Sequence, residues 1–144
     1  MDLDLLDVGE LFWVLHSPGE ERDRVLRKWQ VAEWNVVVAK LHEFMKGPDP
    51  DSRGHAAEAL LRINREEAIE LVLHLLTDPD PGVRWHLCGL MYDRGDHRAT
   101  NGLVSVLLHD TETFVRLIAA DALGKIRAPA AIPALQDAAH NDNA

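Results

Sequence analysis

The chain has 144 residues, is 47% hydrophobic, and carries a formal net charge of −9 from 15 basic and 24 acidic residues. This apolar content excludes a disordered chain, and no run of residues approaches the ~18 consecutive apolar residues of a membrane-spanning helix. The acidic balance argues against nucleic-acid and anionic-membrane partners, because their phosphates would be repelled.

The first residues and the cysteine content predict a cytoplasmic protein. The opening Met1-Asp-Leu-Asp lacks the basic start of a secretory signal. The single cysteine, Cys88, cannot form a disulfide within the chain. We expect one domain over residues 1–144: an irregular cap and first repeat over 1–47, regular repeats over 48–140, and a frayed tail over 141–144.

Residues 1–47 predict the least regular part of the fold. Apolar residues indicate a leading helix over residues 3–15, and a second helix is expected over residues 36–45. Between them, Arg22 lies 31 residues before Arg53, as expected for a degenerate first repeat. Terminal repeats are generally irregular, because the end of a stack must present a face that tolerates water.

A short phrase then recurs three times, over residues 49–60, 78–90 and 110–123. Its arginines, Arg53, Arg84 and Arg116, lie 31 and then 32 residues apart. A constant period of this length is typical of stacked helical pairs, each of which buries its apolar side against its neighbours.

Apolar spacing predicts two helices in each repeat. In the first helix, apolar or small residues follow the arginine at intervals of three and four, the period of one helical face. A second helix is expected over residues 69–76 and again over 103–108, where the apolar residues up to Leu108 are expected to face inward. Gly95 marks the bend between paired helices, and Pro129 and Pro133 are expected near the start of the final helix.

The phrase resembles the HEAT-repeat superfamily, in particular the short PBS-lyase HEAT-like repeats, whose pattern is D-x-x-x-x-V-R, then A-A-x-A-L-G, then A-I-P-A-L. Residues 110–124 and 131–135 are closest to it, 78–84 agree well, and 49–60 have a shorter turn without the valine. The resemblance implies an all-α, right-handed α-solenoid of about four helical pairs with an N-terminal capping helix.

The resemblance also implies a structural ladder in which aspartate and arginine side chains join neighbouring repeats. Arginine suits this role because its planar fork can bridge a carboxylate and turn carbonyls together. An anion-binding role is the alternative, but the aspartates are expected to cap the helix starts. The ladder residues are Asp78, Arg84, Asp110, Arg116 and Arg53.

The residue after each arginine is expected to point outward, about 170° from the inward stripe at ~100° per residue. These positions hold Gly54, Trp85 and Leu117, and Phe114 and Tyr92 fall on the same outer half. Exposed aromatic and leucine side chains are typical of protein-contact surfaces. The alternative is that they pack between neighbouring helices.

A second candidate surface is the curved face lined by the second helices. Its expected polar positions are Glu70, His74, Asn101, Ser105 and His109.

Metal, cofactor and catalytic sites are not predicted. Deoxyhypusine hydroxylases, which are also HEAT-repeat proteins, bind iron through repeated His-Glu pairs. Here only His42-Glu43 forms such a pair, whereas His55 and His86 are followed by apolar residues. The motifs bring no nucleophile, base and orienting group together.

We therefore predict a non-catalytic scaffold that binds another protein, with the partner's identity and the oligomeric state left open. The resemblance implies one alternative, a subunit that attaches or detaches phycobilin chromophores. A second alternative is a HEAT-like DNA glycosylase, in which Trp13, Trp29 and Trp34 would supply a stacking platform. The acidic charge argues against that enzyme, and we expect the tryptophans to fill the core.

Overall fold

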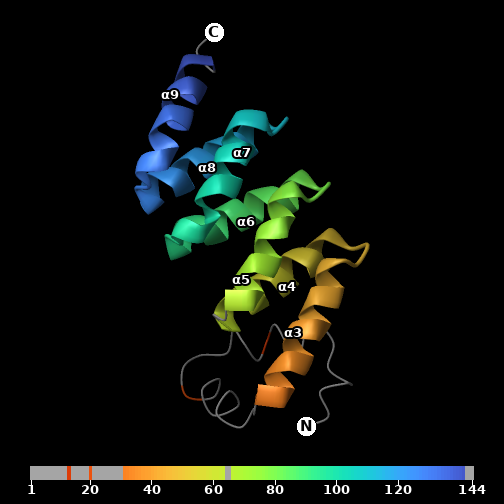
Figure 1. The fold of residues 1–144 in the computed structure, drawn as a ribbon. Helices are drawn as coiled ribbons and strands as arrows, with labels where there is room; N and C mark the ends of the chain where they lie inside the picture. Colours follow the sequence, from red (N-terminus) through yellow and green to blue (C-terminus); the bar gives the residue numbers. More distant parts are fainter. Residues whose placement is uncertain (1–12, 14–19, 21–30, 64–65, 142–144) are drawn as a thin grey trace. The chain divides into compact units, whose positions relative to one another are not determined.

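A computed structural model describes residues 13, 20, 31–63 and 66–141 of the chain. These residues form helices and turns without a strand (Figure 1). The predicted leading helix, Arg22 and the tail over 142–144 lie outside the described residues. The α-helices are α3 (Val31–Met45), α4 (Pro50–Ile63), α5 (Glu66–Leu73), α6 (Pro81–Arg94), α7 (Thr100–His109), α8 (Thr113–Ile126) and α9 (Ile132–Asn141).

The chain divides into two compact units, Met1–Val72 and Leu73–Ala144. In the first unit, α3 packs along α4. The inward sides of its helices follow the predicted apolar spacing, and their largest side chains are fully buried. These are Val37, Leu41, Leu60, Ile69 and Val72.

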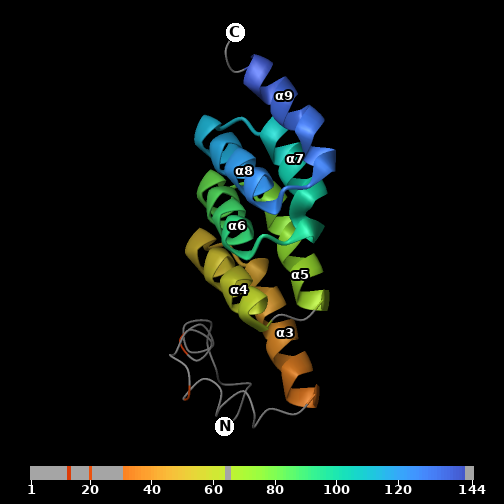
Figure 2. The same ribbon diagram turned by 90° about the vertical axis from the view of Figure 1, so that its left-hand side faces the viewer.

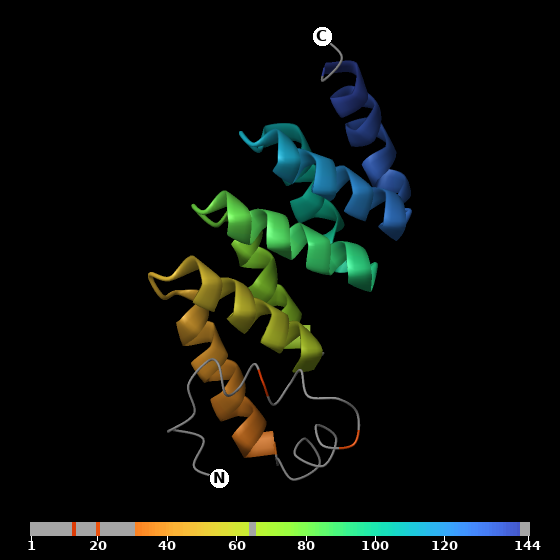
Figure 3. The same cartoon turned by 180° about the vertical axis from the view of Figure 1, so that it is seen from behind.

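In the second unit, the first helices of two successive pairs, α6 and α8, lie side by side (Figures 2 and 3). The second helix α7 packs against α8 and also contacts α9. Large apolar side chains from both layers fill the space between them: Leu87, Met91, Leu103, Val115 and Leu123.

Short 3-10 turns precede α6, α7 and α9. They are η2 (His74–Thr77), η3 (His97–Ala99) and η4 (Pro129–Ala131). The predicted helix over residues 69–76 therefore tightens into a 3-10 turn after Leu73. Pro129 begins η4 and Pro133 is the second residue of α9, where a missing amide hydrogen costs little.

Both ends of α6 lie at residues that the sequence marks as turn residues. The Asp80 carboxylate accepts a hydrogen bond from the amide of Val83 at 3.1 Å, and Pro81 follows as the first helical residue. Gly95 ends the helix in the left-handed conformation, with φ 62°, as its predicted place at the bend requires. At the same place after α8, Arg127 adopts φ 55°.

Three burial predictions were wrong. Gly54 is buried, although its helix position was expected to face outward. Leu108 is exposed on α7, because the apolar run of that helix is wider than its buried side. Trp13 is exposed and Trp34 half-buried, so neither fills the core as expected, and Trp29 lies outside the described residues.

Candidate functional site

The three repeated arginines each close the loop that precedes their own helix. In every copy, Nη1 donates hydrogen bonds to the carbonyl oxygens six and five residues earlier. This shared offset makes the arginine the anchor of the repeat. The acceptors are Gly47 (2.9 Å) and Pro48 (3.0 Å) for Arg53, Asp78 (2.8 Å) and Pro79 (3.2 Å) for Arg84, and Asp110 (3.0 Å) and Thr111 (3.4 Å) for Arg116.

This offset corrects the alignment of the first copy. Asp49 lies four residues before its arginine, and its carboxylate accepts from the Ser52 amide at 2.8 Å. It therefore corresponds to Asp80, the cap of α6, and not to Asp78 as the sequence phrase suggested. Gly47 occupies the place that Asp78 holds in the second copy. Asp78 and Asp110 lie outside the helix starts that they were expected to cap.

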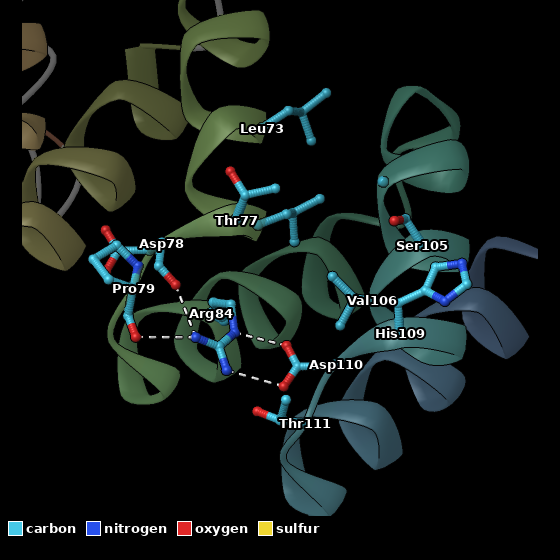
Figure 4. Close-up of a pocket in the computed structure, with 12 residues that line it drawn as sticks. Leu73, Thr77, Asp78, Pro79, Arg84, Ser105, Val106, His109, Asp110 and Thr111 are labelled. Carbon is cyan, nitrogen blue, oxygen red and sulfur yellow. Dashed lines mark hydrogen bonds and ion pairs between the residues drawn. The ribbon is translucent and has the colours of Figure 1, made fainter.

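Arg84 also reaches across to the next helical pair. Arg84 on α6 donates from Nε and Nη2 to the two carboxylate oxygens of Asp110, at 2.6 and 2.9 Å (Figure 4). The side chains are only 13% and 4% exposed. This two-pronged ion pair joins α6 to the loop between α7 and α8, as a structural ladder requires.

The ion pair shifts both pKa values. Burial raises the pKa of Asp110, but hydrogen bonds from Arg84 and from the Glu112 amide more than offset this, so the pKa lies below its ordinary value. The hydrogen bonds to Asp110 raise the pKa of Arg84. Both groups therefore remain charged at neutral pH and hold each other in place.

A hollow of about 460 Å³ lies beside this pair, between η2 and α7. Two of the predicted polar residues, Ser105 and His109, line it (Figure 4). Gly102 also lines it: a Cβ there would lie 2.5 Å from Leu76 Cδ1, so the glycine allows α7 to approach η2 closely. The apolar lining of the hollow includes Leu73, Leu76, Pro79 and Val106.

The other polar positions predicted on the second helices are not brought into this hollow. His74 and Asn101 are exposed but do not line it. Glu70 is exposed on α5 and belongs to the first unit.

Four large apolar side chains are exposed on the first helices of the second unit. On α6, Trp85 is 49% and Tyr92 39% exposed; on α8, Phe114 is 46% and Leu117 61% exposed. The helices α6 and α8 that carry these four residues lie side by side (Figure 3), and we call the four exposed side chains together the outer stripe.

The C-terminal end of the outer stripe is hollowed and carries basic groups. Lys125 Nζ lies 5.5 Å from the centre of the Tyr92 ring, within range of a cation–π interaction. Ile118, Asp121 and Arg127 line the same open hollow of about 630 Å³. Lys125 was not among the predicted site residues, although the repeat period places it next to the position equivalent to Tyr92.

The described residues show little that could bind a metal ion or act as a nucleophile. No three side chains of histidine, cysteine, aspartate or glutamate come together among them. His55 is exposed, and His86 is half-buried. Burial raises the pKa of the Cys88 thiol to about 12, so the thiolate is scarce at neutral pH.

Comparison with known families agrees with the repeated geometry. The family described as HEAT repeats matches residues 38–122, and the PBS lyase HEAT-like repeat matches residues 115–141. The first match covers more than half of the chain, which therefore belongs to the HEAT-repeat family of α-solenoids and is a helical scaffold built from repeats. No curated protein matched the chain. Within the described residues, no helix combines the length and apolar character needed to cross a bilayer.

Proposed function

We propose that this chain is a non-catalytic scaffold that binds another protein through the outer stripe. The observation that carries the proposal is the exposure of Trp85, Tyr92, Phe114 and Leu117 on two adjacent helices. Aromatic anchors gathered on one surface are typical of protein interfaces, where a few large side chains supply most of the binding free energy.

The outer stripe is a better candidate than the hollow beside α7. In that hollow, Arg84 and Asp110 bind each other, and Arg84 is also bonded to the carbonyl groups of its own loop. A partner would have to compete with these bonds. At the outer stripe, burial of exposed apolar surface is itself favourable.

The chemistry of the second unit also supports a binding role. Its thiol, Cys88, is buried with a raised pKa, and Asp110 is held by Arg84. A catalytic base or nucleophile needs access to its substrate and a suitable pKa, which neither group has. We propose that this binding takes place in the cytoplasm, because a chain whose one cysteine is buried and free does not need an oxidising compartment to form disulfides.

Affinity capture from an extract tests the proposal. The double variant Trp85→Ala, Leu117→Ala should lose specific partners that the unaltered chain retains, because it removes the two most exposed side chains of the outer stripe. Quantitative mass spectrometry of the eluates measures the loss.

The matched control is Leu108→Ala, Ile132→Ala, which removes two exposed apolar side chains outside the outer stripe. It should keep the partners, and circular dichroism should show equal helicity in all three proteins. Equal eluates from the stripe variant and the unaltered chain would refute binding at this surface.

One observation favours the bilin-related alternative. The PBS lyase HEAT-like repeat matches residues 115–141, which include most of α8 and all of α9. If the chain handles phycobilins, adding a bilin to the purified protein should change the absorbance spectrum of the chromophore. The scaffold proposal expects an unchanged spectrum.

A further inference from the structure

The two helices of the outer stripe carry charge in the same order along their length. Their starts are acidic, with Asp80 before α6 and Glu112 before α8 as the N-cap residues. Their last turns are basic, with Arg94 on α6 and Lys125 on α8. The four apolar side chains lie along the helices between these charged ends.

Other charges modify this order without reversing it. Asp93 and Asp121 are exposed near the basic end, and Arg127 directly follows α8. Asp96, just beyond Gly95, is paired with Arg98. Apart from that pair, the basic end has three cations, Arg94, Lys125 and Arg127, against the carboxylates of Asp93 and Asp121. At the acidic end, Arg84 and Asp110 neutralise each other.

We infer that the outer stripe binds a second copy of this chain, related to the first by a two-fold axis. The inference rests on the proposed function, because it names the partner of the same surface. A two-fold axis that lies in the interface and runs perpendicular to α8 makes the two α8 helices antiparallel. The acidic start of each α8 then lies opposite the basic end of the other. Apolar residues then meet apolar residues, which is the self-complementarity that a symmetric dimer needs.

The size of the apolar surface fits a weak dimer. From the exposed fractions, the four side chains present about 400 Å² of surface, given that an aromatic side chain buries 150–250 Å². A standard stable interface buries about 800 Å² on each partner. The charged ends must supply the remainder, so we expect dissociation constants in the micromolar range.

The net charge of −9 works against self-association at long range. This repulsion is screened beyond about 8 Å at physiological ionic strength, whereas pairs in direct contact are screened much less. Once two copies are in contact, the complementary charges at the ends of the stripe therefore matter more to dimerisation than the net charge does.

Sedimentation velocity of the full chain over a micromolar concentration series measures the dimer directly. We expect the unaltered chain to shift toward the dimer as its concentration rises. Leu117→Asp should raise the dissociation constant at least tenfold, because it places a carboxylate in the apolar centre. The matched control, Ile132→Asp, alters a comparably exposed apolar residue on α9 and should leave the dimer unchanged.

A charge exchange tests the antiparallel arrangement. Glu112 makes no side-chain cap bond to α8, so replacing it removes no bond of that kind. Glu112→Lys and Lys125→Glu should each weaken the dimer, because in each variant residue 112 of one copy faces a residue 125 of the same charge in the other copy. An equimolar mixture of the two variants should recover it as a heterodimer, and the double variant should recover it alone.

Three results would overturn the inference: an unaltered chain that stays monomeric throughout the series, a dimer that tolerates Leu117→Asp, or a mixture of charge variants that recovers nothing. Failure here is distinguishable from failure of the proposed function. A monomeric chain that still captures proteins through Trp85 and Leu117 keeps its role as a scaffold, with a different partner on the stripe.

Discussion

At the scale of single residues, the repeated arginines share one set of bonds. Arg53, Arg84 and Arg116 all close their own loops through carbonyl groups. Arg84 additionally holds the carboxylate of Asp110 in the following pair. The shared bonds stabilise each repeat, and the ion pair stabilises the junction between two repeats.

This ion pair predicts a measurable loss of stability. Asp110→Ala should lower the free energy of unfolding by about 3 kcal/mol, because it leaves the largely buried guanidinium of Arg84 without its counter-charge. Chemical denaturation measures the change. Asp121→Ala, which removes an exposed carboxylate from α8, should change the free energy by less than about 0.5 kcal/mol.

The pH dependence of the same pair follows from the pKa shift of Asp110. Its pKa is lowered in the folded state, so its contribution is complete above the ordinary aspartate pKa of about 3.9 and is lost as the pH falls through the folded value. The stability gap between the unaltered chain and Asp110→Asn should therefore shrink in acid. A gap that stays constant down to the acid transition would show that the charge of Asp110 contributes nothing.

At the scale of helices, the two first helices of the second unit end in the same backbone conformation with different residues. Gly95 follows α6 and Arg127 follows α8, and both have positive φ. Glycine adopts this conformation without a steric penalty, whereas a residue with a Cβ does not. The end of α8 is therefore the more strained.

Replacing that residue should stabilise the protein. Arg127→Gly should raise the free energy of unfolding by about 1 kcal/mol, because the backbone conformation then carries no Cβ penalty. Lys125→Gly, two residues earlier and inside α8, should lower it by about 1 kcal/mol. Thermal or chemical denaturation measures both changes, and equal signs for the two variants would contradict the assignment of strain to position 127.

The helices were largely predictable because their signals are local. Apolar residues at intervals of three and four marked the buried sides around Arg84 and Arg116, and Gly95 marked a helix end. The 3-10 turn at η2 was not predictable, because residues 73–76 keep the apolar character of the helix before them. Asp49 was misassigned because each copy of the phrase was taken to begin at an aspartate, whereas the first copy has Gly47 at that place. Counted back from Arg53, the first loop has the same length as the other two.

The candidate site was predictable only in part, for a similar reason. Helical geometry placed Trp85 and Leu117 outward, and both are exposed. The contact between Lys125 and Tyr92 joins two helices. To predict it, the repeat period would have had to be applied to the outward positions as well as to the core. The hollow beside α7 depends on the close approach at Gly102, which residue type alone does not reveal.

At the scale of the whole molecule, membership in the HEAT-repeat family accounts for the recurring helical pairs but leaves the partner open. Such repeats bury apolar surface between neighbours, so a large apolar side chain left exposed on a helix within the repeat calls for another explanation. The outer stripe provides four of these side chains on two adjacent helices. Our account assigns them to protein binding.

Site-specific photo-crosslinking tests this central claim most directly. Benzoylphenylalanine would replace Leu117 on the outer stripe or, as the control, Ile132 on α9; these residues are 61% and 53% exposed. After irradiation in cell extract, position 117 should give discrete protein adducts, including one of twice the chain mass if a second copy binds, and position 132 should give none of these. Equal adducts at both positions, or none at position 117, would contradict the account.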